Sequence, residues 1–127
     1  MISVMQYYPI IEEVVKGIYA AYPELLEKYG ERGKQKCFED NQHHFAHLET
    51  AYLLRNAKVF TDYALWLNNI LVNHGMKTDH LLDNFRRIEQ AIRGRISPPE
   101  KEAAFLFYLQ EAQQLLQQLH SDRSSFG

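Results

Sequence analysis

The sequence predicts an all-α protein, folded as a single antiparallel bundle of five or six helices. Apolar residues recur at spacings of three and four rather than two, which is the periodicity of helices with one buried face. β-branched residues are sparse, so no segment reads as a strand. The chain has 127 residues, of which 46% are hydrophobic, which is enough for one domain with a proper core and too few for two. We therefore expect residues 1–127 to form one domain.

The first half of the chain predicts one helix, a break and a longer helix. Apolar residues share one face over about residues 8–21. Pro23 should stop or kink this helix before a short helical turn that ends at Gly30. After the connection "YGERG", a long helix is expected from about 33 to 55.

Two further helices are expected over about 57–74 and from Thr78 or Asp79 to about 95. His74 and Gly75 mark the end of the first of these. The links between the helices are short, which favours antiparallel neighbours.

The last helix has the clearest start signal. In "SPPE", Ser97 can cap the helix, Pro98 suits the first helical position, and Glu100 stands where a capping box places a carboxylate. This helix should run to about 120, followed by a frayed tail over 121–127.

Charge and cysteine usage exclude several classes of protein. The net charge is -2 with both signs interspersed, so we expect no nucleic-acid or membrane-surface partner, and the arginines around "FRRIEQAIRGR" read as a solvated face. No apolar run approaches the ~20 residues of a membrane span, and no secretory signal is visible. The lone Cys37 excludes an intramolecular disulfide and a thiolate-rich zinc site, so we expect a cytoplasmic protein.

The segment "KCFEDNQHHFAHLETAYLL" places polar residues on an apolar helix face. At about 100° per residue, Asn41 and His44 fall inside the apolar stripe, His47 lies at its edge, and His43 points away. The residues of this face are Cys37, Asn41, His44, Phe45, Leu48, Ala51 and Tyr52.

The histidine spacing argues against a ready-made metal site. His43 and His47 are four residues apart and could share a metal, but two ligands hold a structural zinc poorly. Neither a His-Glu-x-x-His nor a Glu-x-x-His motif is present, and no phosphate loop or nucleophile elbow is visible. The alternative to a binding domain is a metal-dependent helical-bundle enzyme that uses His43, His44, His47 and a carboxylate such as Asp40.

Asn41 and His44 must either find partners or border a cavity, because an unpaired buried polar group costs roughly 1 to 3 kcal/mol. Asp40, one turn before His44, is a candidate partner. One interpretation is a satisfied polar network between helices; the other is a ligand-facing patch. The next helix places Tyr63 on its inner face and Trp66 on its flank, so Asn41, His44, Tyr63 and Trp66 are the candidate ligand-binding residues.

Other apolar positions bear on packing and association. Leu48, Leu67 and Leu116 centre the apolar faces of three helices and should be buried. Off these faces lie Leu65, Val72, Leu106 and Phe107, which favour a homodimer or a protein partner. The alternative for Phe107 is packing under the N-terminal segment.

A pattern of mostly packing residues runs through residues 36–92. It comprises a Cys-x-Glu-Asp opening, a histidine with a leucine four residues on, and an aromatic run: Cys37, Glu39 and Asp40; His44 and Leu48; Phe60, Tyr63, Trp66 and Leu67. This stretch resembles the helical-bundle module that precedes a cobalamin-binding domain in methionine-synthase-like proteins and cobalamin-dependent light-sensing regulators. In that family the bundle caps the upper face of the cofactor or shapes its surroundings, so the resemblance implies cobalamin as a possible ligand.

Two departures separate the chain from that family. The cobalt-ligand motif Asp-x-His-x-x-Gly is absent, and Met76 and Lys77 stand where the light sensors carry Glu-His. What the resemblance implies is therefore the bundle and a cavity lined by Trp66, Tyr63 and His44. We expect a non-catalytic sensory or regulatory domain that binds a small molecule or a protein partner.

Overall fold

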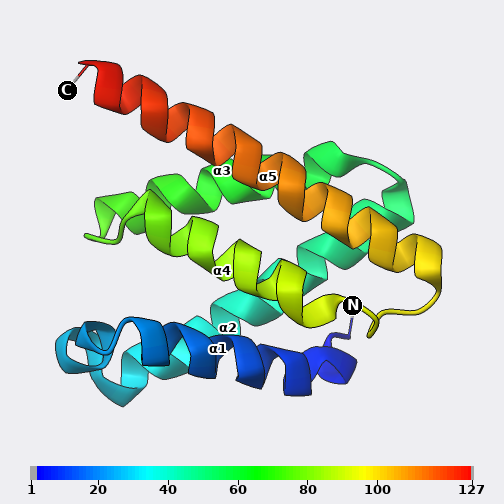
Figure 1. Cartoon of the computed structure of the whole chain (residues 1–127), viewed down its shortest axis with the longest axis horizontal. Helices are drawn as coiled ribbons and strands as arrows, with labels where there is room; N and C mark the ends of the chain where they lie inside the picture. Colours follow the sequence, from blue (N-terminus) through cyan, green and yellow to red (C-terminus); the bar gives the residue numbers. More distant parts are fainter. Residues whose placement is uncertain (1–2, 127) are drawn as a thin grey trace.

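The computed structural model describes the backbone of residues 3–126 and the side chains of residues 3–119. Helices account for nearly all of this part of the chain, and it contains no strand (Figure 1). The all-α prediction is confirmed. None of the described helices is long and apolar enough to cross a membrane. The elements are a 3-10 helix η1 (Met5–Tyr7) and five α-helices, α1 (Tyr8–Ala21), α2 (Glu24–Leu54), α3 (Ala57–Asn73), α4 (Thr78–Ile92) and α5 (Pro99–Phe126).

The helix α2 joins the short turn and the long helix that were predicted separately. Its only non-helical residue is Gly30, with φ 68° and ψ -166°, so the predicted connection "YGERG" shrinks to a kink at one glycine. This backbone conformation is essentially restricted to glycine. The segment Glu24–Tyr29 therefore leaves the axis of the rest of α2 at Gly30.

The ends of α4 and α5 differ from the predicted positions. The helix α4 ends at Ile92 rather than near residue 95, because Gly94 has φ 76° and turns the chain. The helix α5 continues to Phe126, past the predicted end at about residue 120. Gly127 lies outside the described residues.

The start of α5 is one residue later than predicted, at Pro99 instead of Pro98. The carboxylate that reaches back to the preceding backbone is Glu102 rather than Glu100. Its Oε1 accepts hydrogen bonds from the backbone N–H groups of residues 95 and 96, both at 3.1 Å. A carboxylate near the start of this helix does bond to the preceding backbone, but it stands two residues after the predicted Glu100.

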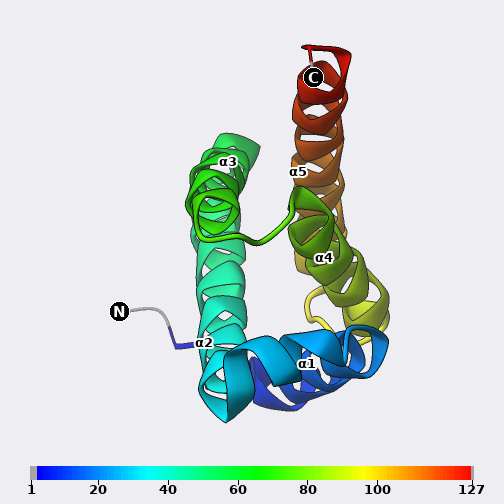
Figure 2. The same ribbon diagram turned by 90° about the vertical axis from the view of Figure 1, so that its left-hand side faces the viewer.

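The helices pack in an order that does not follow the chain. The helix α3 packs against α2 and α5, and α4 packs against α1 and α5, whereas α3 and α4 share only a small contact despite the short link between them. In both views α1 lies along one edge of the molecule, below α2 and α4 (Figures 1 and 2).

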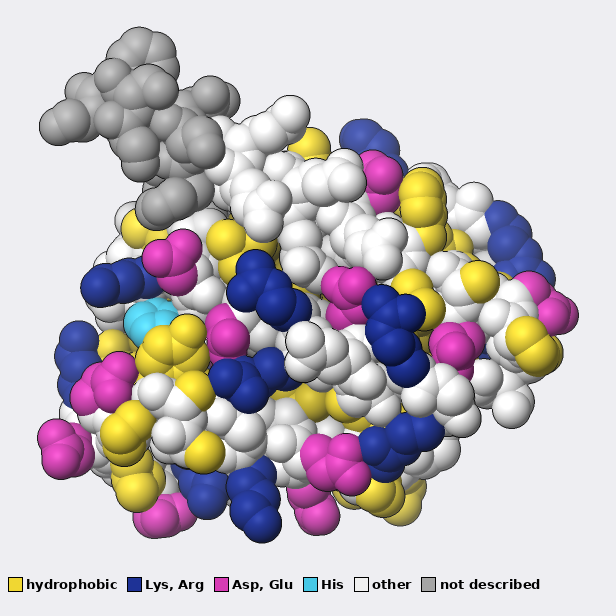
Figure 3. All heavy atoms as spheres, in the orientation of Figure 1, with side chains coloured by type: hydrophobic (Ala, Val, Ile, Leu, Met, Phe, Trp, Pro, Cys, Tyr) yellow, Lys and Arg dark blue, Asp and Glu magenta, His cyan; other side chains and the backbone are white. Residues whose placement is uncertain are grey.

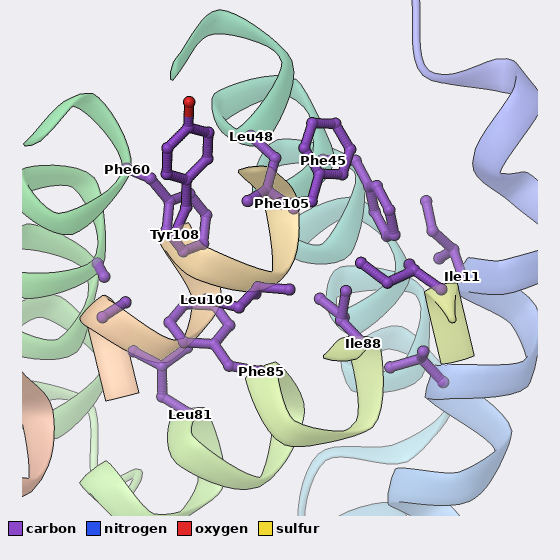
Figure 4. Close-up of a cluster of buried hydrophobic side chains, with 14 of the residues drawn as sticks. Ile11, Phe45, Leu48, Phe60, Leu81, Phe85, Ile88, Phe105, Tyr108 and Leu109 are labelled. Atoms are coloured by element: carbon purple, nitrogen blue, oxygen red, sulfur yellow. The ribbon is translucent and has the colours of Figure 1, made fainter. Parts of the chain in front are cut away.

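The core lies where α2, α3, α4 and α5 meet, and α1 closes it with side chains such as Ile11 (Figure 4). Leu48 and Leu116 are 0% exposed and Leu67 is 8% exposed, so all three predicted core leucines are buried. The largest fully buried side chains are aromatic and come from all four of these helices: Phe45, Phe60, Phe85 and Phe105.

The residues predicted off the core faces divide into two groups. Leu65 and Leu106 are half-buried and pack against the core of their own chain. Phe107 is 52% exposed, so the alternative that it packs under the N-terminal segment is wrong. On the face shown in Figure 3, basic and acidic side chains alternate and the apolar ones are scattered.

Candidate functional site

A buried polar network joins α2, α3 and α4. Asn41 and His44 on α2 are 0% and 1% exposed, and their neighbours are Tyr63 on α3 and Asn84 on α4. The two asparagine side chains exchange hydrogen bonds, with Asn84 Nδ2 donating to Asn41 Oδ1 at 2.7 Å and Asn41 Nδ2 donating to Asn84 Oδ1 at 3.1 Å. The His44 ring lies 2.7 Å from the Tyr63 hydroxyl through Nδ1 and 3.3 Å from Asn84 Oδ1 through Nε2.

The hydrogen-bond partners in this network determine which atoms carry the protons. Asn41 Nδ2 also donates to the backbone carbonyl of Cys37 at 2.9 Å, which sets the orientation of that amide. Asn84 must then present Oδ1 to His44, so His44 carries its proton on Nε2. His44 Nδ1 is left as an acceptor, and the Tyr63 hydroxyl donates to it.

Burial keeps this network uncharged. It lowers the pKa of His44 to about 3 and raises the pKa of Tyr63, because neither charged form can be hydrated there. Both ring nitrogens of His44 are satisfied, as the network interpretation predicts. The predicted partner of His44 is wrong: Asp40 instead forms an ion pair with Lys36 at 3.4 Å.

A cavity of about 190 Å³ lies beside the network, between the end of α1, the first half of α2, the end of α3 and the start of α4. Tyr19, Tyr22 and Tyr29 form one side of it. His44, Asn84, Cys37, Asp40 and Lys36 are among its polar lining groups. Its aliphatic walls come from all four helices and the α3–α4 turn, and they are Ile18, Leu25, Leu67, Leu71, Met76 and Leu81.

The cavity continues towards solvent past the kinked start of α2. Leu25, Tyr29, Met76 and His80 also line an adjoining hollow of about 490 Å³. The exposed charged side chains of Glu24, Glu27, Lys28 and Lys77 border that hollow.

Of the four predicted ligand-binding residues, only His44 lines the cavity. Asn41 and Tyr63 are buried in the network behind it. Trp66 is 61% exposed, and it contacts the outer side of Tyr63 with ring centroids 6.3 Å apart. The predicted grouping of Trp66 with His44 around one pocket is therefore wrong, because Tyr63 stands between them.

The tyrosine side of the cavity was not predicted. Tyr19, Tyr22 and Tyr29 lie on either side of the break at Pro23, where the sequence predicted a helix end and a short helical turn but no binding residue. Aromatic residues gathered at a helix break were the available signal, since such residues must pack against whatever follows the break.

The three histidines of α2 do not converge. His43 is exposed. His47 Nδ1 donates a hydrogen bond to the backbone carbonyl of His43 at 2.8 Å, and the His47 ring stacks on the Tyr63 ring with centroids 3.8 Å apart. Among the side chains of residues 3–119 there is no group of three or more histidine, cysteine or acidic residues placed to hold a metal ion. The described side chains therefore provide no set of metal ligands for the alternative of a metal-dependent enzyme.

The ionisable groups that line the cavity are not set up for nucleophilic chemistry. Burial raises the pKa of the Cys37 thiol to about 12, so the nucleophilic thiolate is scarce at neutral pH. Burial also raises the pKa of Asp40, an effect that its pairing with Lys36 partly offsets, and lowers the pKa of His80. The arrangement resembles a pre-formed binding site more than a reaction centre.

Comparison with known proteins found no matching family model, no matching curated protein and no matching solved structure. The fold and the cavity define the class of the chain as an all-α helical domain with a cavity that opens to solvent.

Proposed function

We propose that this protein is a non-catalytic sensory or regulatory domain that binds a small molecule in the cavity between α1, α2, α3 and α4. The observation that carries the proposal is the cavity itself, which has about 190 Å³ of space, mostly apolar walls and a few polar groups. The His44 network supports the proposal, because its hydrogen bonds fix the position of one wall of the cavity. Both ring nitrogens of His44 bond to protein groups, namely Tyr63 and Asn84.

A fragment screen read by ¹H–¹⁵N NMR tests this proposal. Small aromatic and aliphatic compounds should cause saturable shift changes around Ile18, Leu67 and Leu81, which line the cavity. The variant Leu71→Phe, which fills the cavity, should abolish those changes, whereas Ile70→Phe, which alters a neighbouring residue off the cavity wall, should preserve them. No saturable change with any compound, or equal changes in Leu71→Phe, would overturn the proposal.

Cobalamin, the cofactor that the family resemblance implies, is far larger than the cavity. Its contact with this chain would have to be on the surface, where Trp66 is 61% exposed beside Tyr63. Specific quenching of Trp66 fluorescence by cobalamin, with haem as the comparison, tests this surface mode. Quenching that survives Leu71→Phe would separate it from binding in the cavity.

We further propose that the protein forms a homodimer through its exposed apolar side chains. Phe107 and Leu53 are 52% and 67% exposed, which is costly in water if they stay uncovered. Half-buried Leu65 contributes less, because it packs on its own core. Sedimentation should show a dimer that Phe107→Ser weakens and Gln110→Ser does not; a monomer at high micromolar concentration would remove this proposal.

A cytoplasmic location completes the proposal. Its basis is the single free thiol of Cys37, which suits a reducing compartment. Fractionation of cells that produce the native chain would test it.

A further inference from the structure

The volume of the cavity limits the size of its occupant. Its volume is about 190 Å³. An engineered protein cavity of about 150 Å³ accommodates benzene. The space inside the cavity therefore suits one aromatic ring or a fused pair of rings, and a longer ligand would have to extend into the adjoining hollow, which charged side chains border.

The walls favour a flat, apolar occupant. Tyr19, Tyr22 and Tyr29 contribute aromatic side chains to the lining around the break between α1 and α2, and Leu67 and Leu71 contribute aliphatic ones from α3. Aromatic rings gain from offset or edge contacts with other rings in addition to the burial of their area. An aromatic ligand therefore gains more from these walls than an aliphatic one of the same volume.

The charges around the cavity already balance. Lys36 and Asp40 both line it and pair with each other at 3.4 Å. His44 is neutral, and burial lowers the pKa of His80, which favours its neutral form. A charged ligand would lose its hydration without gaining a free counter-charge, so the balance favours an uncharged one.

Among the ionisable groups that line the cavity, Asp40 is the one that offers a ligand a carboxylate acceptor. His44 uses both ring nitrogens, and Asn84 Oδ1 already accepts from two donors. Among the side chains described, Asp40 pairs only with Lys36, through Oδ1, so most of its lone-pair positions remain open. An ionised carboxylate only accepts hydrogen bonds, so the group of the ligand that faces Asp40 must be a donor.

We infer that the cavity selects a compact, uncharged aromatic molecule with a single N–H or O–H donor, of the size of indole or a simple phenol. This inference rests on the proposed function and specifies its ligand. The aromatic body would lie among the tyrosines and the leucines of α3, and the donor would bond to Asp40.

A matched pair of probes tests the donor. Indole and benzofuran have nearly the same shape, but only indole carries an N–H donor. Calorimetry at pH 7 should show that the wild type binds indole at least 10-fold more tightly than benzofuran. The charged relatives tryptamine and indole-3-carboxylate should bind at least 10-fold more weakly than indole.

A matched pair of variants tests Asp40. In Asp40→Leu, which removes the acceptor but keeps a side chain of similar size, the preference for indole over benzofuran should fall to about 2-fold or less, whereas Glu39→Leu, which changes the exposed neighbouring carboxylate, should keep it. Circular dichroism and the benzofuran affinity, which should change little, show that the variant is folded and that its cavity is intact.

The outcomes separate this inference from the proposed function. If indole and benzofuran bind equally, and Leu71→Phe abolishes both, the cavity binds ligands but the donor selectivity is wrong. If only charged or aliphatic compounds of the fragment screen bind, the inferred ligand class is wrong while the proposed function stands. If nothing binds in the cavity, both fail together.

Discussion

Two buried polar residues of α2 are stabilised by opposite means. His44 is kept neutral by burial and by hydrogen bonds to Tyr63 and Asn84. Glu49 instead meets the ammonium group of Lys101, with Nζ and Oε1 2.6 Å apart, and accepts a hydrogen bond from Tyr7. One helix therefore carries a neutral anchor to α3 and α4 and an ionic anchor to η1 and α5.

The ionic anchor predicts a large effect of Glu49→Gln. The side chains of Lys101 and Glu49 are 17% and 9% exposed, so the exchange leaves a mostly buried ammonium without its counter-charge. We expect the free energy of unfolding to fall by about 3 kcal/mol. Urea denaturation of the variant beside the wild type measures this loss.

An exposed ion pair provides the control for Glu49→Gln. Lys58 and Asp62 are 3.4 Å apart at their charged atoms, and their side chains are 76% and 62% exposed. Asp62→Asn should therefore cost less than about 1 kcal/mol. Equal small losses for both variants would contradict the role given to Glu49.

At the residue scale, the sequence predicts which residues point inwards but not which residues they contact. Helical periodicity placed Asn41 and His44 on the buried face, and both are buried. Their partner Asn84 comes from α4, and periodicity within one helix carries no information about the facing helix. Asp40 was the predicted partner because it is one turn away in sequence, but its side chain pairs with Lys36.

At the element scale, the kink of α2 at Gly30 predicts the sign of a substitution. A Cβ at this position would meet nothing within 4 Å, so Gly30→Ala reports on the backbone alone. With φ 68° and ψ -166°, alanine should destabilise the protein by about 1 to 3 kcal/mol.

A stabilising effect of Gly30→Ala would contradict the kink. In a continuous helix the same exchange should stabilise the protein by up to about 1 kcal/mol, because alanine is the better helix former. Thermal and urea unfolding decide between the two, with Gln35→Ala on the exposed side of α2 as a control expected within about 0.5 kcal/mol of the wild type.

Neighbouring leucines of α5 test the face assignments. Leu116 is 0% exposed, whereas its neighbour Leu115 is 36% exposed. Leu116→Ala should cost about 2 to 5 kcal/mol, as should Leu48→Ala, because each leaves a void in the core. Leu115→Ala should cost clearly less, and a Leu115→Ala loss equal to that of Leu116→Ala in urea would reject the observed register of α5.

The helices themselves could be predicted more fully than their packing. The bounds of α1 and α3 follow from periodicity and from the breaks at Pro23 and Gly75, which act locally. The helices against which α3 packs do not follow from such local signals. The short link to α4 limits the distance between the two helix ends, but it does not make the two helices pack along their length. The cavity is a product of that packing, which explains why its tyrosine side could not be predicted from single helices.

At the scale of the whole molecule, the cavity and the ionic anchor lie at opposite ends of α1. Tyr7, which immediately precedes α1, donates a hydrogen bond to Glu49, whereas Tyr19 and Tyr22, at the end of α1, line the cavity. The cavity end also holds the Gly30 kink and the adjoining hollow. A conformational response to a ligand should therefore concentrate at this end, while the ionic end holds the helices in place.

The stability of the whole molecule should depend on pH through His44. Burial lowers the pKa of His44 to about 3, whereas an unfolded chain takes up this proton near pH 6.5. Between these values the unfolded state binds more protons than the folded one, so the free energy of unfolding falls as the pH falls. The contribution of His44 is complete above about pH 6.5, and it decreases by at most about 1.4 kcal/mol per pH unit below that.

The variant His44→Gln isolates this contribution from the carboxylates and the other histidines, which titrate similarly in both proteins. Glutamine cannot take up the proton, so the advantage of the wild type over His44→Gln should be largest at pH 7 and should shrink steadily towards pH 4.5. Urea unfolding at a series of pH values measures the difference. A constant difference would mean that His44 titrates alike in the folded and unfolded chain, which contradicts a neutral ring held between Tyr63 and Asn84.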